Sequence, residues 1–182
     1  DQNFIRYCSI KVICVMLLFC EISTLPLVFI NHLDVLPQHY GLYIFPAFIC
    51  YIFATIFASK YCQHNVNKAI KAGLMMIIAS NAVLLLLINN LELEAGIIQL
   101  VKIFTYIGWG FIFGNATAEI VSSVPGKAGM ASALMIGLEM LFSSIGIYIL
   151  GLFFNGTIFP LCFFMIFWAS ISLYIAHRIS KV

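Results

Sequence analysis

Residues 128–154 read AGMASALMIGLEMLFSSIGIYILGLFF, and Glu139 is the only charged side chain among them. About 20 mostly apolar residues are enough to cross the hydrocarbon core of a bilayer as a helix, so this stretch predicts a membrane span. The whole chain shares its character: 63% of the residues are hydrophobic and 9% are charged, whereas soluble domains carry about 25% charged residues. The mean hydropathy is +1.08. The composition therefore indicates an integral membrane protein and excludes a soluble globular domain.

Outward from this stretch, five more apolar runs of similar length predict an all-α membrane bundle of six helices, residues 1–182, as a single domain. The predicted spans are residues 9–30, 40–59, 69–88, 96–116, 128–154 and 157–176. Short connections containing Asn, Gly or Pro, such as Asn89-Asn90 and Pro125-Gly126, separate them. We expect no soluble domain and no long linker.

Basic residues are distributed unevenly between the two sides of such a bundle. Six spans place all of the following on one side: Arg6, Lys11, Lys60, Lys68, Lys71, Lys127, Arg178 and Lys181. The opposite side carries Asp34, Glu92 and Glu94. Because Lys and Arg are retained on the cytoplasmic side, this predicts cytoplasmic termini in a multi-pass membrane protein.

Several function classes are disfavoured by the sequence. Nine scattered Lys and Arg residues with a net charge of +2 do not make a nucleic-acid surface. The six cysteines include no CxxC pair, so we expect neither a disulfide framework nor a metal site. Signatures of hydrolases, metalloproteases and nucleotide-binding loops are missing, which argues against an enzyme and predicts no cofactor. The opening Asp1-Gln2-Asn3 lacks an initiator Met and leads us to expect a processed or truncated start.

Three charged residues, Glu21, Lys102 and Glu139, fall well inside the predicted spans, and such residues are costly and typically functional. At 1.5 Å per residue, Glu21 lies about 18 Å from the inner end and Lys102 about 9 Å from the outer end. In a core about 30 Å thick these depths nearly coincide, and Glu139 falls close to the midplane. One reading pairs Glu21 with Lys102 as a structural bridge. Another lets Lys102 extend alone to the outer surface.

Glu139 is a candidate proton carrier, because a carboxylate buried without a partner takes up a proton rather than remain charged. Ser132 and Ser143 share its helix face. Gln99, Lys102, Tyr106 and Trp109 form a second polar and aromatic stripe, of a kind that suits a lipophilic cation. The competing readings make Glu139 a hydrogen-bonded helix contact and Trp109 a packing residue.

Small and helix-bending residues complete the pattern. Gly129, Ala133 and Gly137 recur every fourth residue, the spacing that brings membrane helices into close contact. Pro26 and Pro46 lie inside spans, where they predict kinks or gating points.

Two stretches resemble one family. The first comprises Gly110, Gly114-Asn115-Ala116-Thr117-Ala118, Pro125 and residues 128–134, including Gly129 and Ser132; the second comprises residues 26–30, beginning with Pro26, and residues 36–41. Together they resemble the major facilitator superfamily, in particular its Bcr/CflA drug:proton antiporters. The resemblance covers the C-terminal half of that fold and implies two inverted three-helix repeats. Glu21, Glu139, Glu119 and the loop 59–68 depart from the family pattern.

The resemblance implies the C-terminal half of a proton-coupled exporter of small amphipathic compounds or drugs, working by alternating access. Glu21 and Glu139 would carry protons or cations, Lys102 would be a charge partner, and Trp109, Tyr106, Ser132 and Ser143 would line the cavity. The expected partners are the lipid bilayer, small-molecule substrates and protons, and either an N-terminal six-helix half or a second copy of the chain. The alternative is a truncated or nonfunctional six-helix membrane protein with no transport activity of its own.

Overall fold

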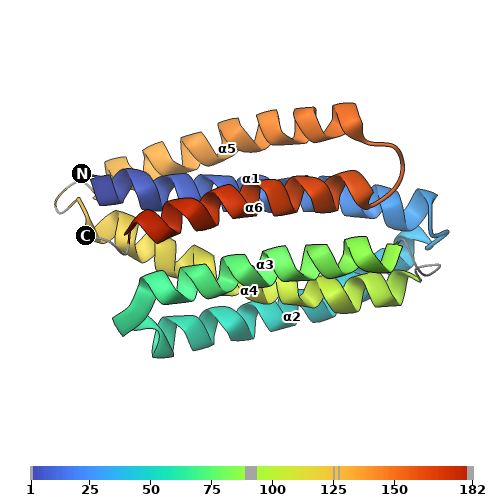
Figure 1. Cartoon of the computed structure of the whole chain (residues 1–182), viewed down its shortest axis with the longest axis horizontal. Coiled ribbons are helices and arrows are strands. Elements are labelled where there is room, and N and C mark those ends of the chain that lie inside the picture. Colours follow the sequence, from blue (N-terminus) through green and yellow to red (C-terminus); the bar gives the residue numbers. More distant parts are fainter. Residues whose placement is uncertain (1, 89–93, 125, 127, 180–182) are drawn as a thin grey trace.

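Six helices of 21 to 30 residues lie side by side in the computed structural model (Figure 1). The structure describes residues 2–88, 94–124, 126 and 128–179. Within these ranges the elements are α1 (Gln2–Asn31), α2 (Pro37–Tyr61), the short 3-10 helix η1 (Gln63–Asn65), α3 (Val66–Ile88), α4 (Ala95–Ser122), α5 (Ala128–Phe153) and α6 (Phe159–Ile179). All six α-helices are long and apolar enough to cross a membrane. The predicted all-α architecture of six helices, each long and apolar enough to cross a membrane, is confirmed.

The helix ends have local causes. Pro37 begins α2, where its missing N–H has no intrahelical acceptor to lose. Asp34 adopts a left-handed backbone with φ of 51° in the preceding turn. Before α6, Gly156 has a φ of 86°, and the Thr157 amide and hydroxyl both donate to Asn155 Oδ1 at 3.2 and 2.7 Å. These residues make the short turns that the sequence predicts.

α1 and α4 extend farthest beyond the predicted spans, at the same end of the bundle. α1 begins at Gln2 rather than Ser9, and α4 continues to Ser122 rather than Ala116. Apolar runs mark the hydrocarbon core, whereas backbone hydrogen bonding continues past them into the polar interface. Lys11, which the sequence counts with the residues of the basic side, lies two residues inside the predicted span 9–30 and is the tenth residue of the helix Gln2–Asn31, so α1 is helical on both sides of it.

The described basic residues outside the two ion pairs gather at one end of the bundle, where Glu119 is an acidic exception beside Lys68 and Lys71. Both termini and the α2–α3 junction lie at one end (Figure 1), together with Arg6, Lys60, Lys68, Lys71 and Arg178. Asp34 and Glu94 lie at the other end. The predicted contributions of Glu92, Lys127 and Lys181, and the turn residues Asn89-Asn90 and Pro125, lie outside the described residues. One end of the bundle is therefore basic in its described part.

The helix contacts come in related pairs. α1 packs against α4, α5 and α6, while α4 packs against α1, α2 and α3; α3 and α6 also pack against each other. Exchanging the first three helices with the last three turns the α1–α5 contact into α2–α4 and the α1–α6 contact into α3–α4, and it leaves α1–α4 and α3–α6 unchanged. α1 and α4 are thus central, whereas α2 and α5 lie on opposite sides of the bundle (Figure 1).

Glycines allow the closest helix crossings. A Cβ on Gly73 of α3 would come within 2.5 Å of the Gly108 carbonyl oxygen of α4, and a Cβ on Gly108 within 2.6 Å of the Gly73 carbonyl oxygen. A Cβ on Gly110 would come within 2.7 Å of Ala54 Cβ on α2. Two backbones therefore meet at the α3–α4 crossing with no room for a side chain.

The predicted packing stripe on residues 128–154 is wrong within this bundle. A Cβ on Gly129 or Gly137 would meet nothing within 4 Å, and Ala133 between them is exposed. The buried face of α5 is instead formed by Ala131, Met135, Glu139, Ser143, Gly146 and Leu150. That face is offset by two residues from the small-residue stripe, and it packs on α1.

Candidate functional site

A buried ion pair joins α1 to α4. Lys102 Nζ donates to Glu21 Oε2 at 2.9 Å, and both side chains have an exposed fraction of 0%. The nearly equal depths predicted for these residues are borne out by this contact. The reading in which Lys102 extends alone to the outer surface is wrong, because its ammonium lies among three helices of the bundle.

The third helix of this site was missed by the sequence analysis. Asn81 of α3 accepts a second hydrogen bond from Lys102 Nζ, at Oδ1 and 2.9 Å. Its amide nitrogen donates to the Ile77 carbonyl at 2.8 Å and approaches Thr105 Oγ1 at 3.4 Å. Ser80 and Thr105 share a hydrogen bond of 2.6 Å between their hydroxyls. The signal was a lone Asn in the middle of an apolar span, where an amide needs a partner.

The predicted stripe on α4 is one continuous buried face. Gln99, Lys102, Tyr106 and Trp109 are all buried. The Trp109 ring meets Tyr106 edge to face at 5.0 Å between centroids and stacks parallel to Phe113 at 6.3 Å. The geometry of Trp109 is that of a packing residue in this state of the bundle. Its role in a cavity wall stays a prediction, as does that of Tyr106.

Polar atoms near the ion pair have no hydrogen-bond partner among the described residues. They are Glu21 Oε1, Tyr40 OH, Gln99 Oε1 and Nε2, Tyr106 OH and Trp109 Nε1. They come from α1, α2 and α4. Buried polar atoms in native proteins are nearly always satisfied. This region is therefore the most polar and least satisfied part of the described core.

A second charge pair joins α1 to α5. Lys11 Nζ lies 3.5 Å from Glu139 Oε1, and the two side chains are 12% and 9% exposed. Lys11 also donates to the Thr117 hydroxyl of α4, and that hydroxyl donates in turn to the Phe113 carbonyl at 2.7 Å. Glu139 therefore has an ion-pair partner, which the sequence analysis did not identify, although its Oε1 accepts no hydrogen bond among the described residues. We refer to Lys11, Glu139 and Thr117 as the inner charge cluster.

Neighbouring residues on α5 share this site only in part. Ser143 is buried on the same face as Glu139, and its hydroxyl has no described partner. Ser132 is half-buried, one position away from the buried Ala131. The predicted common face therefore holds for Glu139 and Ser143 but only marginally for Ser132.

The residues that carry the resemblance contact mainly neighbouring helices or the backbone of their own helix. Pro26 lies inside α1, and Gly110 lets α2 approach α4. Asn115 donates from Nδ2 to the Phe111 carbonyl of its own helix at 2.8 Å. Gly114 has Thr55 Cγ2 of α2 as its nearest neighbour, 3.9 Å from a built Cβ. Pro125 lies outside the described residues.

The two ion pairs differ in burial and in hydrogen bonding. The Glu21–Lys102 pair is fully buried and held by Asn81, so its charges balance inside the core. The inner charge cluster is slightly exposed. Lys11 donates to Thr117, whereas Glu139 Oε1, 3.5 Å from Lys11 Nζ, accepts no hydrogen bond among the described residues, so the hydrogen bond of Lys11 does not depend on Glu139. Within the described ranges, no three His, Cys, Asp or Glu side chains gather to hold a metal ion.

Comparison with known proteins adds no family to these observations. No family model, no curated protein and no solved structure matches the chain. The resemblance to the major facilitator superfamily therefore stays a prediction from the residues quoted above.

Proposed function

We propose that the chain is one six-helix bundle of a proton-coupled secondary transporter of the major facilitator type, exporting small amphipathic compounds by alternating access. The observation that carries this proposal is the inner charge cluster: an ionisable pair within the membrane-spanning region, at a contact between three helices. Ionisable residues at such depth are expensive and characteristic of ion and proton pathways.

The pairing of helix contacts supports the architectural part of the proposal. Exchange of α1–α3 with α4–α6 preserves the contacts. Because each set contains three helices, an odd number, α4 runs opposite to α1 and the two sets run in opposite directions through a membrane. Inverted repeats of this kind are common in secondary transporters, which place their sites at the interface between repeats.

Proton coupling would act through the contact of Glu139 with Lys11. When Glu139 is charged, it attracts Lys11 and holds α5 against α1. When Glu139 takes a proton, that attraction is lost and Lys11 keeps Thr117 of α4 as its acceptor. Protonation of Glu139 therefore weakens the contact between α1 and α5 more than any other helix contact. A cationic substrate competing with the proton for Glu139 would couple export to proton entry.

In this proposal Glu21 and Lys102 have a different role from the one the sequence suggested. Their pair, with Asn81, joins α1, α3 and α4 into a unit that moves as one body. Trp109 and Tyr106 belong to the same unit. The moving partner is a second six-helix bundle, either an N-terminal half or a second copy. The basic end of the bundle would lie on the cytoplasmic side of a bacterial inner membrane.

The test is the pH dependence of transport in a Glu139→Gln variant. The native membrane complex would be reconstituted into proteoliposomes, with efflux of a panel of fluorescent lipophilic cations followed under an imposed pH gradient. We expect wild-type efflux to rise with the gradient and Glu139→Gln efflux to be independent of it. Glu94→Gln removes an exposed carboxylate at the opposite end and should behave like wild type. An unchanged gradient dependence in Glu139→Gln would contradict the proposal.

A second candidate function is a six-helix membrane protein without transport activity of its own. The observation that favours it is the complete burial of the Glu21–Lys102 pair, which is the geometry of a structural tether. On this reading the inner charge cluster is a tether as well. Glu139→Gln would then lower stability, and wild-type proteoliposomes would show no gradient-driven efflux.

A further inference from the structure

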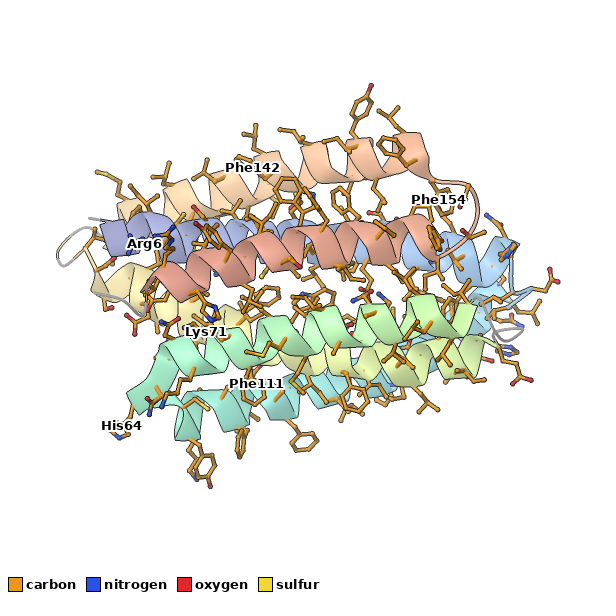
Figure 2. All side chains as sticks on the ribbon, viewed as in Figure 1. Arg6, His64, Lys71, Phe111, Phe142 and Phe154 are labelled. Atoms are coloured by element: carbon orange, nitrogen blue, oxygen red, sulfur yellow. The ribbon has the colours of Figure 1, made fainter. Side chains whose placement is uncertain are left out.

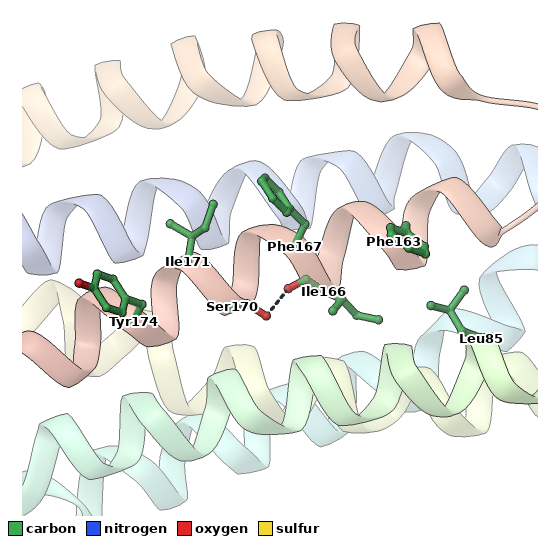
Figure 3. Close-up of a pocket in the computed structure, with 7 residues that line it drawn as sticks. All are labelled: Leu85, Phe163, Ile166, Phe167, Ser170, Ile171 and Tyr174. Carbon is green, nitrogen blue, oxygen red and sulfur yellow. Dashed lines mark hydrogen bonds between the residues drawn. The ribbon is translucent and has the colours of Figure 1, made fainter.

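A groove runs along the outer face of α6 beside α3. Its apolar part is a cavity of about 550 Å³, lined by Leu85 of α3 and by Phe163, Ile166, Phe167, Ser170, Ile171 and Tyr174 of α6 (Figure 3). From Phe163 to Tyr174 the helix rises about 16 Å. That is close to the depth of one leaflet, half of a core about 30 Å thick.

The groove contains almost no unsatisfied polarity. Ser170, its only polar side chain apart from Tyr174, donates to the Ile166 carbonyl of its own helix at 2.7 Å (Figure 3). The remaining lining is aliphatic or aromatic. A hydrocarbon chain therefore fits this part of the groove better than a polar ligand does.

A second, more polar cavity, which we call the head of the groove, adjoins the apolar part at the basic end of the bundle. It has a volume of about 510 Å³ and is lined by Ser170, Leu173, Tyr174, His177 and Arg178. It shares Ser170 and Tyr174 with the first cavity, so the two are continuous. The described cations at this end also include Arg6, which donates to the Arg178 carbonyl at 3.4 Å.

Arg178 is held in place at this head. Its Nε and Nη2 donate to the Tyr174 hydroxyl at 3.2 and 2.7 Å, and its guanidinium lies 5.3 Å from the centre of the same ring. A guanidinium carries five N–H donors, more than one phenolic oxygen accepts. The Nε–Nη2 edge is used by Tyr174, and the Nη1 hydrogens and the second Nη2 hydrogen remain on a positioned guanidinium to bind a phosphate group.

We propose that this groove binds one anionic phospholipid, with an acyl chain along Phe163–Tyr174 and its phosphate at Arg178. A soluble phosphate compound shares the headgroup chemistry but leaves the apolar wall unused. The lipid is favoured because the cationic head and the apolar wall form one continuous surface at the depth of one leaflet. Basic residues at the cytoplasmic surface attract anionic lipid headgroups. The proposal does not depend on transport activity.

The experiment is native mass spectrometry of the full chain in detergent, with equimolar phosphatidylglycerol and phosphatidylcholine of the same acyl chains. We expect one phosphatidylglycerol bound in preference to phosphatidylcholine. Arg178→Gln should bind it about fivefold more weakly, the effect of one basic residue near a membrane surface. Lys60→Gln removes a cation of the same end that lies outside the groove, over the Tyr61 ring, and should bind as wild type does.

A steric variant tests the apolar part separately. Ser170→Trp places a large ring where the two cavities join and should reduce binding by at least fivefold. Ser144→Trp is its matched control, because Ser144 is also exposed and also donates to the carbonyl four residues earlier, at 2.9 Å. Retention in Ser144→Trp together with loss in Ser170→Trp supports the proposal.

Three results would overturn it. Equal binding by wild type and Arg178→Gln would exclude the phosphate contact. Equally strong competition by soluble glycerol phosphate and by phosphatidylglycerol would show that no acyl chain is held. A dimer that Ser170→Trp disrupts, with lipid binding unchanged, would assign the groove to a second copy of the chain instead.

Discussion

The Glu21–Lys102 pair gives the sharpest stability prediction. Lys102→Met leaves the Glu21 carboxylate in the core with no cation. Removing one partner of a buried pair costs about 3–5 kcal/mol of unfolding free energy. Asn81 Oδ1 also loses its donor. We therefore expect a loss of about 4 kcal/mol, and a similar loss for Glu21→Met, which strands the Lys102 ammonium with only Asn81.

The double variant tests whether Glu21 and Lys102 stabilise the protein as a pair. Glu21→Met with Lys102→Met leaves no unpaired charge and puts two apolar side chains of similar length in contact. The remaining cost is one unsatisfied amide oxygen on Asn81, about 1–3 kcal/mol. We expect the double variant to be about 2 kcal/mol more stable than either single variant. Replacing a whole buried pair by apolar residues is often neutral, whereas removing half of it is not.

Unfolding by sodium dodecyl sulfate in mixed micelles measures these differences, with tryptophan fluorescence as the signal. Trp109 is one of two tryptophans and is buried on the same helix face as Lys102. Lys60→Met, an exposed cation at a helix end, is the control and should change stability by less than about 0.5 kcal/mol. If the double variant loses the sum of the two single losses, Glu21 and Lys102 do not interact and the reasoning fails.

Two further predictions concern packing and orientation. Gly73→Ala should lower the free energy of unfolding by about 1–3 kcal/mol in the same assay, because the new Cβ meets the Gly108 carbonyl oxygen. The control is Gly41→Ala, whose new Cβ meets nothing within 4 Å and which should be neutral or slightly stabilising. Equal losses in both variants would reject the close crossing of α3 and α4. Fusions placed after the last residue should give a fluorescent green fluorescent protein and an inactive alkaline phosphatase if the basic end is cytoplasmic. The opposite reporter pattern would invert the proposed orientation.

The fold was largely predictable because a bilayer imposes few alternatives. Six apolar runs of sufficient length, separated by turn residues, leave only helices as spanning elements. Depth counting also placed Glu21 near Lys102, since helical rise converts sequence position into distance. The buried face of α4 followed from helical periodicity in the same way.

The parts that were missed depend on how helices pack. Lys11 lies at the edge of the predicted span 9–30 and was counted only with the basic side, because nothing in the sequence shows that the packing of α1 on α5 brings it to Glu139. Asn81 carried no motif, and only the approach of α3 to α4 reveals its contact with Lys102. The stripe at Gly129 and Gly137 has the spacing of a packing motif, but spacing alone does not say which face of a helix meets a neighbour.

The ion pair of α1 and α4 also bears on how the protein is made. Glu21 precedes Lys102 by 81 positions, so α1 reaches the membrane during synthesis before its cation exists. A charged residue at a helix centre costs about 3 kcal/mol on insertion, and the apolar residues of α1 must offset that cost alone. Until α4 arrives, the Glu21 carboxyl is best accommodated in its protonated form or beside the insertion machinery. The charge of Glu21 is therefore balanced only after α4 has been made, and the insertion of α1 is complete only when α4 has packed against it.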